Sequence, residues 1–162
     1  MPQSKLINHL YLIDGSGFIF RAYYGIKAQM TRLDGTPTNA VYGYTQMLLK
    51  IVEDTDADYL AVIFDRARKT FRNEIFSEYK SHRPPPPDDL VPQFDLVREA
   101  THAMNIPAVD MEGYEADDLI ATYARQAADR GANVTVVSTD KDLMQIVGGK
   151  IKMFDAMKNI EI

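Results

Sequence analysis

The chain of 162 residues contains no cysteine, so it can form neither a disulfide nor a thiolate metal site. Its three histidines, His9, His82 and His102, are scattered and do not have the spacing of metal ligands, which argues against a zinc site. Any bound metal must therefore be held by oxygen atoms. Oxygen ligands favour magnesium or manganese.

Long apolar runs are also missing. No run approaches the roughly 18 residues of a transmembrane helix, and the first residues lack the basic-then-apolar order of a signal peptide. We therefore expect a cytoplasmic protein. The apolar fraction of 46% and the charged fraction of 25% are ordinary for a globular protein, and the length suits a single domain over residues 1–162.

The net charge of −5 argues weakly against nucleic-acid binding, but the charge is unevenly distributed. Residues 66–83 contain six basic and two acidic side chains, a local charge of +4. The rest of the chain is therefore strongly acidic. A cationic segment beside acidic groups could steer a phosphate chain toward a metal.

Short apolar runs alternate with helical patterns along the chain. We predict strands over Leu10–Asp14, Leu60–Asp65, Pro107–Met111, Val134–Ser138 and Ile151–Phe154. Helices are predicted over Asn39–Glu53, Pro92–Met104, Glu115–Arg130 and, as a short turn of helix, Asp140–Val147. This alternation predicts an α/β fold with a mostly parallel five-stranded central sheet flanked by helices.

Seven carboxylates fall where apolar runs end or the next helix begins: Asp14, Asp65, Glu115, Asp117, Asp118, Asp140 and Asp142. The carboxyl ends of parallel strands lie at one edge of a sheet, where α/β proteins bind ligands. So many anions at one edge would repel each other by roughly several kcal/mol per close pair at low effective dielectric. The pattern therefore predicts divalent metal at this edge.

Each of these acids also has a plainer explanation. Asp14 could cap a tight turn, and Asp65 could cap a helix or pair with Arg66 or Arg68. The acids at 115–118 suit a helix dipole, and Lys141 could neutralise its two neighbours. The metal hypothesis gains weight because all four groups of acids are expected to converge.

Residues 66–90 form a long insertion after the second predicted strand. The run Pro84–Pro87 cannot be helical and favours extended polyproline II. Three aromatic residues, Phe71, Phe76 and Tyr79, are interleaved with the basic residues. Loops of this length are usually functional or disordered, and we expect a flexible arch that contacts substrate.

A basic and aromatic group follows the first strand. Arg21 could bind a phosphate and Tyr23 could stack on a base. Aromatic residues at such positions more often pack in the core or at its rim. Arg72, Lys80 and Arg83 could likewise form an ordinary solvated face.

Several of these segments together resemble one family. They are Leu12-Ile-Asp-Gly with Phe20-Arg-Ala-Tyr-Tyr, Gly35-Thr-Pro-Thr-Asn-Ala-Val-Tyr-Gly, Phe64-Asp, Phe71-Arg, Tyr79-Lys, Arg83-Pro, Gly113-Tyr-Glu-Ala-Asp-Asp and Thr139-Asp-Lys-Asp-Leu. In this order they resemble the 5′→3′ exonuclease domain of bacterial DNA polymerase I, a flap-endonuclease-like, PIN-related nuclease. The resemblance covers nearly the whole chain.

The resemblance implies a magnesium- or manganese-dependent phosphodiesterase that removes RNA primers or 5′ flaps in replication and repair, with two ions in the complete domain. It implies direct or water-mediated metal ligation by the seven carboxylates, and catalytic roles for Asp14, Asp65, Lys80, Asp117 and Asp140. It also implies contacts with the DNA or RNA–DNA substrate from Arg21, Tyr23, Arg72, Tyr79, Lys80 and Arg83. Two-metal hydrolysis needs no protein nucleophile.

The sequence departs from the family pattern in two places. The family continues into a helix–hairpin–helix element, whereas this sequence stops at Ile162, as in a fragment of a longer chain linked to a polymerase. Arg66 follows Asp65 where the family more often has a small residue.

Three other functions compete with the nuclease. A flap- or DNA-binding module without turnover would follow from truncation, and a PIN-type ribonuclease would act on single-stranded RNA. A receiver-like phosphoacceptor also places aspartates at strand ends, but it needs fewer than seven. The long basic segment favours flap substrates.

Overall fold

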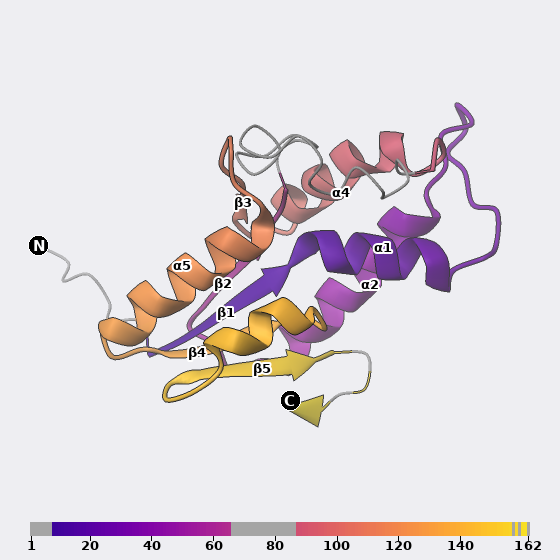
Figure 1. Cartoon of the computed structure of the whole chain (residues 1–162). Coiled ribbons are helices and arrows are strands. Elements are labelled where there is room, and N and C mark those ends of the chain that lie inside the picture. The colour runs from indigo at the N-terminus through magenta and orange to yellow at the C-terminus, as the bar shows by residue number, and fades with distance from the viewer. Residues whose placement is uncertain (1–7, 66–86, 157, 159, 162) are drawn as a thin grey trace, which may run out of the picture.

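The computed structural model describes residues 8–65, 87–156, 158 and 160–161. These residues form one six-stranded sheet in the order β3-β2-β1-β4-β5-β6, with helices on both faces (Figure 1). The strands are β1 (His9–Asp14), β2 (Tyr59–Ile63), β3 (Ala108–Val109), β4 (Asn133–Val137), β5 (Ile151–Asp155) and β6 (Ile160–Glu161). All neighbouring strands are parallel except β5 and β6. The predicted α/β fold with a mostly parallel sheet is confirmed, and β6 adds a short antiparallel strand to the five expected.

Helices α1 (Gly15–Gly25), α2 (Asn39–Asp54) and α4 (Val91–Ala103) cover one face of the sheet. Helix α5 (Ala116–Asp129) and the 3₁₀ helix η1 (Lys141–Ile146) cover the other. Alternate residues of each strand supply the two cores, because successive side chains of a strand point to opposite faces. Ile13 and Val62 pack beneath α1 and α2, whereas Leu12 and Ile63 pack beneath α5.

Helix α1 was not predicted, because Gly15 and Gly17 disfavour a helix by propensity. Three side chains on one side of the helix, Phe18, Ile19 and Ala22, are nevertheless buried, and that burial stabilises it. Gly15 is explained by packing, because a Cβ there would lie 2.6 Å from Phe64 Cε1. The absence of a side chain at Gly15 therefore lets α1 approach β2 closely.

Strand register fixes where the site lies. Asp14 pairs with Ile63, and Ile13 pairs with Val137, so the carboxyl ends of β1, β2 and β4 are level. The third strand is shorter than predicted, and the chain leaves the sheet before Asp110. The predicted helix over Asp140–Val147 is the tighter η1. None of the described helices has the length and apolar character needed to cross a membrane.

Candidate metal centre

Asp14 ends β1 and begins α1 at the same time. Its Oδ1 accepts a hydrogen bond from the Gly17 N–H at 3.0 Å, as an N-cap does. Its Oδ2 accepts one from the Ser138 hydroxyl at 2.9 Å, which joins β1 to the end of β4. The capping role that we set against a metal role is therefore present.

Burial raises the pKa of Asp14 above its ordinary value, and the negative charges of Asp65 and Asp140 raise the pKa further. The hydrogen bonds from Gly17 and Ser138 oppose this shift but do not cancel it. The pKa of Asp14 thus depends on acids that follow two other strands, β2 and β4. A nearby cation would favour its charged form.

The segment after β4 turns so that Asp140 lies near Asp14. The Asp140 N–H donates to the Ser138 hydroxyl oxygen at 3.0 Å, and the Asp142 N–H donates to Asp140 Oδ1 at 2.9 Å. Asp140 therefore caps η1. Ser138 links Asp14 and Asp140 through one hydroxyl group.

Three acids begin α5. Glu115 is 4% exposed, and its N–H donates to Asp118 Oδ2 at 3.3 Å as half of a capping box with Asp118. Asp117 Oδ1 accepts from the Asp118 N–H at 2.9 Å. The helix-capping explanation thus applies to Glu115 and Asp118. Asp117 is not one of the two residues of that capping box.

Five of the carboxylates form two overlapping triads. One oxygen from each of Glu115, Asp117 and Asp118 lies within 4.8 Å of the others, and the same holds for Asp117, Asp140 and Asp142. Two like charges at about this separation repel by up to about 3 kcal/mol at an effective dielectric of about 20, less where water screens them. Asp117 is common to both triads. Each triad could hold a metal ion.

Asp65 joins the end of β2 to the start of α5. Its Oδ1 accepts a hydrogen bond from the Ala116 N–H at 2.6 Å, so it adds to the N-terminal cap of that helix. Its own N–H donates to the Ser16 hydroxyl oxygen at 3.3 Å. The alternative partners Arg66 and Arg68 lie outside the described residues. All seven predicted carboxylates therefore lie along one edge, linked by contacts or charge interactions.

The predicted nucleic-acid contacts divide into two groups. Arg21 lies beside the centre, where it lines a small cavity with Asp14, Ser138 and Thr139 and forms a 3.7 Å ion pair with Asp155. The Tyr23 hydroxyl donates to Asp89 at 2.6 Å. The other four, and most of the predicted arch over residues 66–90, lie outside the described residues: Arg72, Tyr79, Lys80 and Arg83.

Two further acids at this edge were not singled out from the sequence. Asp110 follows β3 and Asp155 ends β5, and each forms an ion pair with an arginine, Arg98 and Arg21 respectively. Both follow short apolar runs, so the pattern that identified the other acids also applied to them. Their arginine partners could not be identified from sequence spacing.

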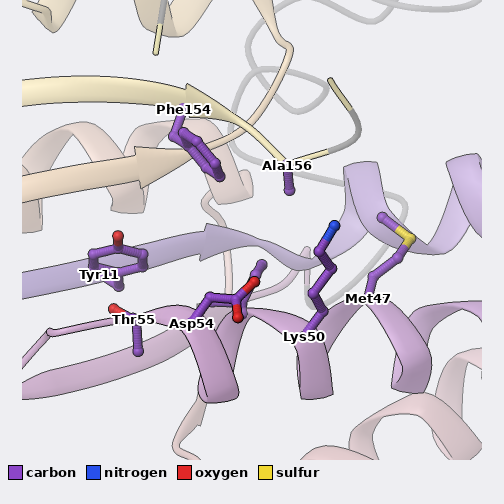
Figure 2. A pocket seen from close by; sticks show the side chains of 8 residues that line it. Tyr11, Met47, Lys50, Asp54, Thr55, Phe154 and Ala156 are labelled. Atoms are coloured by element: carbon purple, nitrogen blue, oxygen red, sulfur yellow. The ribbon is translucent and has the colours of Figure 1, made fainter. Parts of the chain in front are cut away.

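A separate pocket lies between α2 and strands β1 and β5 (Figure 2). Tyr11 and Phe154 form its aromatic part, and Lys50, Asp54 and Thr55 bring polar atoms toward it. None of the seven acids lines this pocket. The candidate metal centre therefore lies at the sheet edge and not in this pocket.

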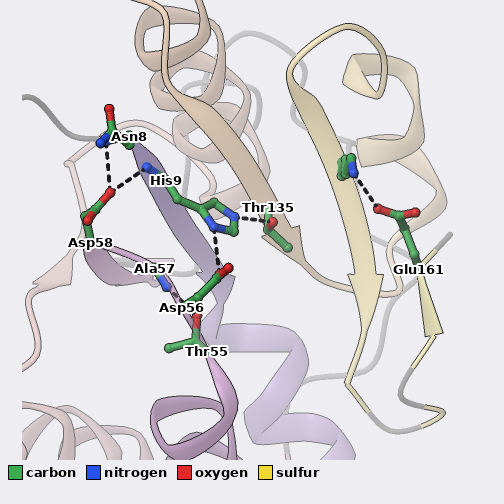
Figure 3. A network of polar contacts seen from close by, with 9 residues as sticks. Asn8, His9, Thr55, Asp56, Ala57, Asp58, Thr135 and Glu161 are labelled. Carbon is green, nitrogen blue, oxygen red and sulfur yellow. Dashed lines mark hydrogen bonds and ion pairs between the residues drawn. The ribbon is translucent and has the colours of Figure 1, made fainter.

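The opposite end of the sheet is held by another polar network (Figure 3). His9 begins β1, and its ring nitrogens lie 3.0 Å from Asp56 Oδ1 and 2.8 Å from Thr135 Oγ1. Asp58 Oδ2 accepts from the N–H groups of Asn8 and His9 at 3.0 and 2.9 Å. These contacts connect β1, β4 and the loop after α2.

Comparison with known proteins agrees with this arrangement. A model of the family described as the 5′-3′ exonuclease, N-terminal resolvase-like domain, matches residues 9–162. The chain is 51% identical to DNA polymerase I of Rhizobium leguminosarum over 96% of its own length and 16% of that protein's. It is 37% identical to a 5′-3′ exonuclease of Aquifex aeolicus, over 93% of this chain and 52% of that protein.

The fold is also found among solved structures. One is the bacteriophage T5 flap endonuclease in a pseudo-enzyme–product complex with DNA and metal ions, with a TM-score of 0.67 and 20% identity. That match covers 95% of this chain and 57% of the phage protein. The chain thus spans between 16% and 57% of the length of these proteins. With residues 9–162 matched, it belongs to the family of 5′-3′ exonuclease N-terminal, resolvase-like domains.

Proposed function

We propose that this domain acts in a divalent-metal-dependent 5′→3′ exonuclease and 5′-flap endonuclease that hydrolyses phosphodiesters of DNA and RNA primers in replication and repair. The observation that carries the proposal is the pair of carboxylate triads sharing Asp117. Membership of the exonuclease family supports the same activity. Because the relatives are much longer than this chain, we propose their activity for it.

The donor set fits magnesium or manganese, because both triads offer only carboxylate oxygens. We propose two ions, with Asp117 contributing to both. Asp14 and Asp65 would complete the centre directly or through water. When bound, such ions supply Lewis acidity to the phosphodiester and neutralise charge that develops on it.

The remaining predicted residues would bind the nucleic acid. Arg21 lies at the edge beside Asp14, where a guanidinium can meet a phosphate that approaches the acids. We propose phosphate contacts for Arg72, Lys80 and Arg83, with Lys80 at the scissile phosphate, and stacking contacts for Tyr23 and Tyr79. Residues 66–90 would form the arch that receives the 5′ strand.

We also propose that the domain belongs to a longer chain with a polymerase region, as in the DNA polymerase I relative of which it matches 16%. A nicked or flapped DNA, or an RNA primer on DNA, would be the substrate of that protein. Its cytoplasmic location stays a prediction.

Cleavage of a labelled 5′-flap DNA in Mg²⁺ tests the proposal. Asp117→Asn and Asp140→Asn should each lower the cleavage rate by at least 100-fold, because each removes charge from a carboxylate triad. The control is Glu53→Gln on the exposed end of α2, which should cleave like the unmodified protein. Cleavage unchanged in both aspartate variants would contradict the proposal.

Binding measured in Ca²⁺ before Mg²⁺ is added separates turnover from binding alone. Retention of the flap followed by product supports the nuclease. Retention without product would support a DNA-binding module, and a preference for single-stranded RNA would support a PIN-type ribonuclease.

A further inference from the structure

Arg98 of α4 contacts three different groups at the corner that follows β2. Its Nη2 donates to the Asp65 carbonyl oxygen at 2.6 Å, and its Nη1 donates to the Asp110 carboxylate. Its guanidinium carbon lies 5.0 Å from the centre of the Phe64 ring. One partly buried side chain thus connects a helix, the end of β3 and the residue that carries a predicted metal ligand.

The backbone at this corner is held from several sides. Phe64 is 1% exposed, and its N–H donates to the Val109 carbonyl oxygen at 2.8 Å. The N–H of Asp65 donates to Ser16, while its carbonyl oxygen accepts from Arg98. With the backbone of Asp65 held, its carboxylate can reorient only by rotation about the side-chain bonds. That carboxylate accepts a hydrogen bond from the Ala116 N–H.

The charge of Arg98 is directed at Asp110 and at a backbone carbonyl. The Asp65 carboxylate therefore accepts a hydrogen bond from the Ala116 N–H and interacts electrostatically with Asp14. A guanidinium can make these contacts together because its donors form a rigid planar fork and its face stacks on a ring. The single ammonium of lysine could not reproduce them.

We propose that Arg98 is a positioning residue of the metal centre, which sets the direction of the Asp65 carboxylate through the Phe64–Asp65 corner. This inference rests on the proposed function, in which Asp65 helps to hold a divalent cation. Partners that orient metal ligands typically change metal affinity by about 10- to 100-fold when they are replaced.

A double-mutant cycle with Mn²⁺ calorimetry tests the proposal. Arg98→Lys should raise the dissociation constant for Mn²⁺ by about 10-fold in the unmodified protein, and by less than about 2-fold in the Asp65→Asn background. Asp110→Asn, which keeps the shape of its side chain, should act in the same direction. Arg32→Lys, which alters an exposed arginine–aspartate pair in a loop, is the matched control and should change nothing.

Equal losses of affinity in the two backgrounds, or no loss in Arg98→Lys, would overturn the proposal. The amide proton resonance of Ala116 gives a readout that needs no metal, because that N–H donates to Asp65. It should shift in Arg98→Lys and not in Arg32→Lys. If the protein binds no Mn²⁺ but this resonance shifts, the proposed function fails while the positioning contact stands; an unshifted resonance overturns the positioning contact itself.

Discussion

At Asp14 and Asp65, one carboxylate has both a structural role and a position in the acidic cluster. Each accepts a hydrogen bond from the first turn of a helix, Asp14 from Gly17 and Asp65 from Ala116. A carboxylate has two oxygens and about four lone-pair sites, so a cap leaves capacity for a cation. At these residues, capping and metal binding were posed as alternatives, but the geometry allows both.

Tyr23 gives a pH-dependent prediction at the residue scale. Its hydrogen bond to Asp89 raises the pKa of the Tyr23 phenol to about 12, because the bond is made by the protonated form beside a negative charge. The stabilisation from this bond is present below the ordinary tyrosine pKa of about 10 and is lost as the pH rises through 12. Carbon-13 NMR of labelled tyrosine should resolve this late titration.

Asp89→Asn is the matching variant, because it keeps an acceptor and removes the charge. The pKa of Tyr23 should fall toward its ordinary value while the other tyrosines titrate as before. A Tyr23 signal that titrates near pH 10 in the unmodified protein would show that the bond to Asp89 does not persist in solution.

At the scale of the element, α5 shows how capping and cluster roles divide among neighbouring acids. Glu115→Ala removes half of the buried capping box and should lower the free energy of unfolding by about 1 kcal/mol. Asp142→Ala removes an exposed member of the second triad and should change the free energy of unfolding by less than about 0.5 kcal/mol. Urea unfolding in EDTA measures both values, and equal losses would contradict this division.

Helix α1 gives a second prediction at this scale. Gly15→Ala should lower the free energy of unfolding by about 1–3 kcal/mol, because the new Cβ would meet Phe64 and Val62 at 2.6 and 2.7 Å. Gly25→Ala, at the other end of the helix, meets no atom within 4 Å and should stabilise by up to about 1 kcal/mol. Thermal unfolding of the two variants provides the comparison, and a fully stable Gly15→Ala protein would rule out the close approach of α1 to β2.

The strands and the convergence of the acids could be predicted because each depends on local pattern alone. An apolar run followed by an acid indicates a buried strand whose end lies at a known edge of a parallel sheet. Helix α1 could not be predicted, because Gly15 is explained only by its close approach to Val62 of β2 and to Phe64. The partnership of Arg98 with Asp110 and Asp65 likewise depends on packing between elements.

At the scale of the whole molecule, the sheet separates two polar ends. The carboxyl end carries the acids, and the other end is held together by His9, Asp56, Asp58 and Thr135. Because β1 runs from one end to the other, its residues from Asp14 back to His9 lie at increasing distances from the proposed metal centre. We propose that the carboxylates at the first of these ends bind divalent cations.

Paramagnetic line broadening by Mn²⁺, followed in the amide NMR spectrum, tests this binding. We expect substoichiometric Mn²⁺ to broaden the amide signals of Asp14, Asp65, Asp117 and Asp140 most strongly, with broadening that decreases along β1 toward His9. Asp117→Asn should weaken the effect at all of these positions. Broadening centred on His9 and Asp56, or none at any Mn²⁺ concentration that leaves the protein folded, would contradict the proposed binding.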